Sequence, residues 1–250
     1  MPGLATARRS VRSGGIFDGR EIETIIETLD GSDRRGLKIE PPFKHFIFIE
    51  KDPERAAARE SVRFDWPNAE IQVLRGNAND ELLEIIGKAP WTNRSRSRSR
   101  GVVFLDPFSM QVDWSTLKAL SQTECLDIWY LFNVAAVTRQ LAHDYAGIGN
   151  KEAMLDRVLS PRWRDLYAIQ PENPSGQTDI FASLFDVPQK PATAQRTVSK
   201  SQIDQGFEGL LRETFAFVSE SLPIMTPHGG PTFSLFLAVA NLSPACRLGH

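Results

Sequence analysis

The sequence predicts an α/β fold: a doubly wound, mostly parallel sheet with a helical insertion. Three observations predict it. Four short apolar segments follow one another along the chain, each is succeeded by a helical pattern, and the segments are largely continuous in apolar residues. Such strands are typical of a parallel sheet that is covered on both faces, because crossover connections place helices there.

The first two strand-and-helix units lie between residues 45 and 88. The segment His45–Glu50 predicts a strand, and the helix after it begins at Pro53, a residue well suited to the first helical position. The alanines of "DPERAAARESVRF" favour this helix further. The second strand is Glu70–Arg75, and Asn79 or Asp80 marks the start of the helix that follows it.

Two further units and a late helix complete the predicted order. Strand Val102–Leu105 precedes "WSTLKALSQ", and strand Asp127–Phe132 precedes "VAAVTRQLAHDY". Between residues 147 and 200, helical stretches give way to segments rich in Pro, Gly, Ser and Gln, which indicate a helical and loop insertion. Ser201 is the expected cap of the amphipathic helix after it, and Thr226–Phe233 predicts a turn into a final strand.

This order predicts one main domain. We expect residues 1–30 to form an irregular N-terminal segment and residues 31–250 a single α/β domain, with the insertion at about residues 147–200. A short Arg–Ser run, Asn93–Gly101, is expected to be a solvated loop. Its alternative role is contact with nucleic-acid phosphates.

The composition excludes several classes of protein. The 250 residues, 41% of them hydrophobic, suffice for a full buried core. A net charge of -2 and a pI of about 6.1 provide no global basic field. The cysteines, Cys125 and Cys246, are too few for a metal site, and the four histidines lack ligand spacing, so we expect no metal. No apolar run reaches the ~18 residues of a membrane span, which predicts a cytoplasmic protein with no membrane partner.

Polar or turn-forming residues stand at the ends of three of the predicted strands. Ligands of doubly wound sheets bind beyond the carboxyl ends of the strands, so these residues define one predicted site. The candidate site residues are Glu50, Asn77, Ala78, Asp106, Pro107 and Phe108.

Each candidate has a structural and a functional interpretation. Glu50 either solvates a strand end and favours the next helix, or accepts hydrogen bonds from ribose hydroxyls. Asn77 is either a turn or cap residue, or reads an adenine edge together with the backbone at Ala78. Asp106 is either part of a helix-capping turn or a residue that Pro107 holds in an extended conformation. In the second case, backbone carbonyl acceptors would point into the crevice at the ends of the strands.

Four segments, in their order and spacing, resemble one known family. The segments "FIFIEKDPERAAA", "GNAN", "FLDPFSMQVDW" and "LDIWYLF" are similar to those of the three-Cys-motif partner protein family, TcmP. The similarity extends from about Gly31 to the C-terminus and includes Gly230–Asn241 as a late strand. The resemblance implies a fold similar to class I S-adenosylmethionine-dependent methyltransferases. It also implies a separate partner, a three-Cys-motif (phage Gp37/Gp68-like) protein.

The resemblance assigns roles to the candidate residues. Glu50 matches the acid expected at the ribose of S-adenosylmethionine, and Asn77 and Ala78 match the turn on the adenine side. The run from Asp106 through Pro107 to Phe108 matches the motif near the reacting methyl group. It departs from the D-P-P-Y/F pattern used on amino groups, so the class of methyl acceptor stays open.

A second departure leaves two functions open. The family opens with a strand and a turn resembling D-x-F-A-G-x-G, whereas this chain has Gly14, Gly15 and Gly19 without an apolar strand before them. One expectation is a methyltransferase-like protein of unknown acceptor. The other is a non-catalytic or degraded module that acts with the three-Cys-motif protein, with nucleic acid a candidate substrate.

Overall fold

The structure is a computed structural model in which the chain divides into two compact units, Met1–Glu81 and Leu82–His250. The residues that it describes are 32–88, 90–91, 100–107, 109–169, 194–196, 199–225 and 230–241.

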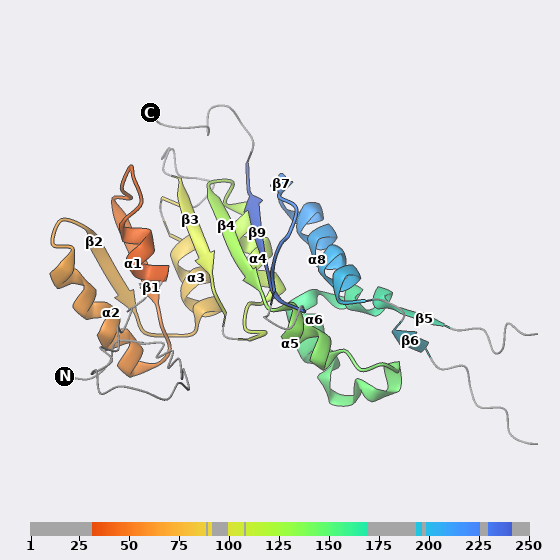
Figure 1. The fold of residues 1–250 in the computed structure, drawn as a ribbon. Coiled ribbons are helices and arrows are strands. Elements are labelled where there is room, and N and C mark those ends of the chain that lie inside the picture. The colour runs from red at the N-terminus through yellow and green to blue at the C-terminus, as the bar shows by residue number, and fades with distance from the viewer. Residues whose placement is uncertain are drawn as a thin grey trace, which may run out of the picture. The chain divides into compact units, whose positions relative to one another are not determined.

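The first unit contains a parallel pair of strands with two helices. Helix α1 (Ser32–Leu37) precedes strand β1 (His45–Ile49), which is followed by helix α2 (Pro53–Asp65) and strand β2 (Glu70–Leu74). The strands pair in parallel over their whole length (Figure 1). Their small core is formed by the buried residues Leu37, Val62 and Ile71.

The helix after β1 begins where the sequence predicts. Asp52 precedes α2 with an extended backbone, and its side chain accepts a hydrogen bond from the backbone N–H of Arg55 at 2.9 Å. Pro53 follows as the first helical residue, where its missing N–H costs no helical hydrogen bond. Helix α3 (Ala78–Ile86) begins four residues beyond the end of β2. Asn79 and Asp80 already lie inside it, so the expectation that one of them marks its start is wrong.

The second unit contains a larger sheet of mixed strand directions (Figure 1). Its strand order is β3–β4–β9–β7, and β8 pairs with β9 as well. Strands β3 and β4 are parallel, whereas β9 is antiparallel to each of its neighbours. The strands are β3 (Gly101–Leu105), β4 (Leu126–Phe132), β7 (Phe217–Val218), β8 (Leu222–Met225) and β9 (Pro231–Val239).

Helices pack on one face of this sheet. Phe207 stacks on Phe132 with ring centroids 3.9 Å apart, and its ring also meets Tyr130 and Phe236 edge-on. Trp114 contacts the same Phe207 ring from a second helix. The complete burial of Tyr130 raises the pKa of its phenol. The helices that contact the sheet are α4 (Trp114–Gln122), α5 (Val134–Gln140) and α8 (Lys200–Thr214), and α6 (Glu152–Leu159) contacts α4.

The expected insertion contains less α-helix than its pattern predicts. It includes the 3-10 turns η1 (Tyr145–Gly147), η2 (Gly149–Lys151) and η3 (Pro161–Leu166), besides α6. The stretch "RWRDLYAI" leaves its helical turn at Tyr167 and becomes strand β5 (Tyr167–Ile169), which pairs with β6 (Ala194–Arg196). Most of the predicted loops lie outside the described residues, as do the N-terminal segment and most of the Arg–Ser run.

The α/β class and the order of the elements are confirmed. Each of the four predicted strands is followed by its helix, and the late strand is β9. The expected cap at Ser201 is wrong: α8 begins at Lys200, and Ser199 precedes it as the cap. Within the described part of the chain, no helix is long and apolar enough to cross a membrane. The single domain and the methyltransferase-like sheet stay predictions.

Candidate functional site

The predicted residues of the first unit lie at one edge of its parallel strand pair. The backbone N–H of Glu50 donates to the carbonyl of Leu74 at 3.0 Å, which extends the ladder one residue past β1. Because β1 and β2 run in the same direction, Glu50 and the turn from Gly76 to Ala78 leave the pair at the same end. The structure therefore brings the expected ribose acid and the expected adenine turn to one edge.

The carboxylate of Glu50 already has two partners. Its Oε2 accepts a hydrogen bond from Arg59 at 2.8 Å, and its Oε1 accepts one from the backbone N–H of Asp52 at 3.1 Å. The side chain is only 16% exposed, which makes this ion pair less screened than one on the open surface. A carboxylate accepts about four hydrogen bonds, so these two leave acceptor capacity for a ligand.

Asn77 has the structural role that the sequence left open. Its Oδ1 accepts the backbone N–H of Asn79 at 2.9 Å, and its carbonyl accepts the N–H of Glu81 at 3.0 Å. The amide side chain therefore fixes the turn into α3. Ala78 is exposed and is the first residue of that helix, where backbone N–H groups have no partner inside the helix.

A second carboxylate approaches this turn. Glu81, in the first turn of α3, folds back so closely that a Cβ added at Gly76 would lie 2.0 Å from its Oε1. An alanine at position 76 would force the Glu81 side chain to move. Glycine therefore allows the carboxylate to lie against the backbone between β2 and α3.

The predicted residues of the second unit follow β3. Asp106 is exposed and makes no hydrogen bond or ion pair with any described residue, whereas Pro107 is buried. Asn133, at the end of the neighbouring parallel strand β4, accepts the backbone N–H of Ala136 at 2.8 Å and caps α5. Phe108 lies outside the described residues.

The sequence-based prediction missed two residues at the predicted site of the first unit, Arg59 and Glu81. A signal for Arg59 exists, because Arg55, Arg59 and Arg63 recur every four residues and so share one face of α2. That spacing alone does not show that the face meets Glu50. Glu81 was not among the predicted site residues.

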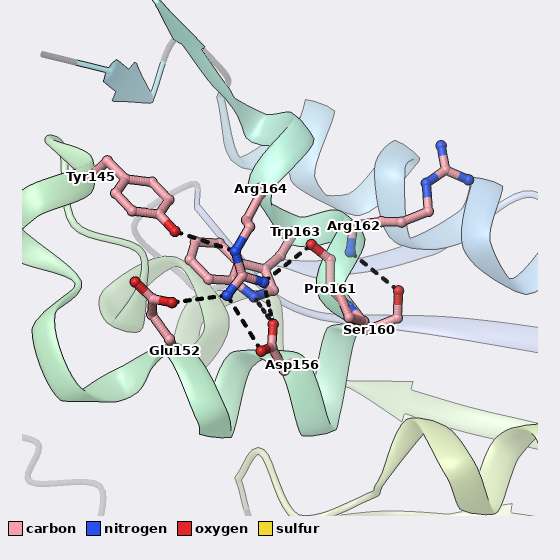
Figure 2. Close-up of polar contacts among 8 residues, drawn as sticks. All are labelled: Tyr145, Glu152, Asp156, Ser160, Pro161, Arg162, Trp163 and Arg164. Atoms are coloured by element: carbon pink, nitrogen blue, oxygen red, sulfur yellow. Dashed lines mark hydrogen bonds and ion pairs between the residues drawn. The ribbon is translucent and has the colours of Figure 1, made fainter.

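A different polar cluster surrounds Arg164 in the second unit (Figure 2). The guanidinium contacts Asp156 through a short hydrogen bond, Glu152 at 2.9 Å and the hydroxyl of Tyr145 at 3.2 Å. It also lies over the ring of Trp163, whose indole N–H donates to Asp156 at 2.8 Å. These contacts tie η3 to α6 and η1.

The charges of this cluster satisfy one another. The Arg164 guanidinium, helped by the Trp163 N–H, lowers the pKa of Asp156 below its usual range. The same carboxylate, with the Tyr145 hydroxyl, raises the pKa of Arg164. Because both groups are charged and paired at neutral pH, we interpret the cluster as a structural clamp.

A pocket between η3 and α8 is too small for a nucleoside cofactor. Its volume is about 110 Å³, whereas pockets for small organic ligands are commonly ~300–1,000 Å³. Its walls are apolar except for Arg162 and Asp165, which pair with each other. Among the described residues, no group of three or more His, Cys, Asp or Glu side chains is placed to hold a metal ion.

Comparisons with protein-family models, with curated proteins and with solved structures found no match to this chain. The resemblance to the three-Cys-motif partner family therefore rests on the four quoted segments and stays a prediction.

Proposed function

We propose that this chain is a methyltransferase-like protein that binds S-adenosylmethionine and acts with a three-Cys-motif protein. One observation carries the proposal: an acid at the end of β1 and an exposed helix start after β2 share one edge of a parallel strand pair. This is where nucleoside ligands bind in doubly wound sheets.

The chemistry of this edge suits an adenosine group. A carboxylate such as Glu50 offers two oxygens to the two vicinal hydroxyls of a ribose, both of which donate. The exposed turn at Asn77 and Ala78 supplies backbone groups, which are the usual partners of an adenine edge. The described residues thus fit the adenosine half of the cofactor. The methionine half would be contacted by the turn that contains Gly14, Gly15 and Gly19, and these glycines lie outside the described residues.

Asp106 is the proposed acceptor-side group. Its exposed carboxylate has no partner among the described residues, so it is free to orient a nucleophile. Methyl transfer depends chiefly on in-line positioning, and S-adenosylmethionine supplies the activated methyl group. Asp106 would then hold the acceptor through a hydrogen bond without acting as a strong base.

Calorimetric titration of the full chain with S-adenosylmethionine and with its demethylated product tests the proposal. We expect Glu50→Gln to weaken both ligands about tenfold or more, because it removes charge from a carboxylate whose hydrogen bonds are worth ~1.5–3 kcal/mol each. Glu60→Gln is the matched control, since Glu60 is a half-exposed acid of α2 that pairs with Arg63, as Glu50 pairs with Arg59. Absence of binding at millimolar ligand, or equal loss in the control, would contradict the proposal.

A second function is favoured by the partners of Glu50. Since Arg59 and the Asp52 backbone already satisfy part of the carboxylate, Glu50 also has a purely structural explanation. The chain would then be a non-catalytic or degraded module that acts with the three-Cys-motif protein, with nucleic acid as a candidate substrate. Failure of both ligands to bind, together with a co-purifying three-Cys-motif protein that Asp106→Asn leaves bound, would favour this function.

A further inference from the structure

The two faces of the larger sheet are both apolar, but only one of them is buried under the described helices. Along β4, Ile128 and Tyr130 point to the face that the helices cover and are buried, whereas Trp129 between them is 38% exposed. The same alternation occurs in β9, where Phe236 is fully buried and Leu235 and Leu237 are only half-buried. Among the described residues of the second unit, this second face is therefore the less covered one, and we call it the open face.

This open face is apolar across every strand. Directly paired residues of adjacent strands project to the same side, so the pairings identify its members. Phe104 pairs with Trp129, Trp129 with Leu237, and Ile224 with Phe233. The apolar residues of the open face are Val102, Phe104, Trp129, Leu131, Phe217, Leu222, Ile224, Phe233, Leu235, Leu237 and Val239.

Charge is nearly absent from the open face. Asp127 is the one charged residue that β3, β4 and β9 place on it, and Arg100 holds its carboxylate with two hydrogen bonds, at 2.7 and 2.8 Å. The backbone N–H of Ala240 donates to the same carboxylate at 3.2 Å. A sheet face meant for water normally alternates with polar residues, and this one does not.

The area of the open face is that of a protein interface. Aromatic side chains bury ~150–250 Å² each, so the exposed 49% of Phe104, 38% of Trp129 and 45% of Phe217 amount to roughly 250 Å². Val102, Leu222 and Ile224 are also exposed, and with the half-buried residues between them the face presents roughly 600–700 Å², above the ~300–600 Å² of the largest patch on typical monomers. A standard interface buries about 800 Å² per partner.

We propose that the open face is the interface of a homodimer, in which a second copy of this chain packs sheet against sheet. The area agrees with what a stable dimer needs. Two identical faces meet without like-charge repulsion, because the one carboxylate that the described strands place there is already paired with Arg100. Sheets pack face to face about 10 Å apart with their side chains interdigitated. Trp129 and Phe104, paired on adjacent strands, are the aromatic anchors of this interface.

Sedimentation velocity of the full chain between ~1 and ~100 µM tests the dimer. We expect wild type to be dimeric, and Trp129→Glu and the milder Val102→Lys to weaken the dimer about 30-fold or more, as expected for a charge placed at an interface anchor. Phe64→Glu is the matched control, since Phe64 is 86% exposed on α2 and is not a member of the open face. Unchanged far-UV circular dichroism must accompany each result.

Several outcomes would overturn the dimer: wild type monomeric throughout this range, either face variant dimerising as tightly as wild type, or an equal loss in Phe64→Glu. If wild type is monomeric, maleimide labelling of Val102→Cys, in a chain whose Cys125 and Cys246 are replaced by Ser, identifies what replaces the dimer. Rapid labelling would assign the open face to a different protein, and protection would assign it to other residues of the same chain.

Discussion

Three carboxylates of this protein differ in what they can do because they differ in their partners. Asp156 is held by Arg164 and the Trp163 N–H, which leaves it structural. Glu50 is held by Arg59 but keeps acceptor capacity, and Asp106 has no partner among the described residues. All three side chains are carboxylates, so the hydrogen-bond partners around each one decide its role.

The clamp around Arg164 predicts a pH-dependent stability. Replacing Asp156 by Asn keeps an acceptor for the Trp163 indole but removes the ion pair. We expect a loss of about 1 kcal/mol in the free energy of unfolding at pH 7, because the partly exposed pair is screened by solvent. Urea unfolding of wild type and variant measures the difference.

The sign of the pH effect follows from the lowered pKa of Asp156. A carboxyl whose pKa is lower in the folded chain stabilises the fold above its unfolded pKa of about 3.9, and this contribution is lost as the pH falls through the folded pKa. The deficit of the variant should therefore shrink below about pH 4. Asp165→Asn is the control, since Asp165 is an exposed partner of Arg162, and a deficit as large there would refute the clamp.

At the scale of elements, helix starts were predictable where the side-chain signal was specific. Pro53 and the acid before it mark α2 in both sequence and structure. The start of α8 was misassigned by two residues, although Ser199 and Gln202 match the S-x-x-Q capping box. Ser199 accepts the backbone N–H of Gln202, whose side chain accepts the N–H of Ser199 in return.

This reciprocal cap predicts a clear difference between two neighbouring serines. We expect Ser199→Ala to lower the free energy of unfolding by about 1 kcal/mol, because it leaves a helix-terminal N–H without its acceptor. Ser201→Ala, on the exposed first turn of the same helix, should change it by less than about 0.5 kcal/mol. Thermal and urea unfolding of both variants measure this, and equal effects would mean that the cap contributes nothing.

At the scale of the molecule, the sequence predicts the elements better than their arrangement. Apolar runs identify β1 to β4 and β9, because continuous apolar residues are typical of strands whose two faces both pack against something. The same runs do not specify neighbours, so the antiparallel position of β9 beside β4 was not predicted. For the site, parallel pairing suffices to place Glu50 and Asn77 at one edge, whereas Arg59 depends on how α2 packs.

The proposed cofactor site makes a prediction about the stability of the chain that holds it. A ligand that binds only the folded state stabilises that state, by about 2.7 kcal/mol when its concentration is 100 times its dissociation constant. For the unfolding transition that includes Glu50, this corresponds to a rise of roughly 5–10 °C in the melting temperature. Both S-adenosylmethionine and its demethylated product should produce it, since the adenosine group is common to both. At the same ligand concentration, a tenfold weaker affinity leaves about 1.4 kcal/mol of stabilisation, so Glu50→Gln should remove about half of the shift or more, and Glu60→Gln should retain it. A shift that survives Glu50→Gln unchanged would place the ligand away from the end of β1, because no other described acid follows that strand directly.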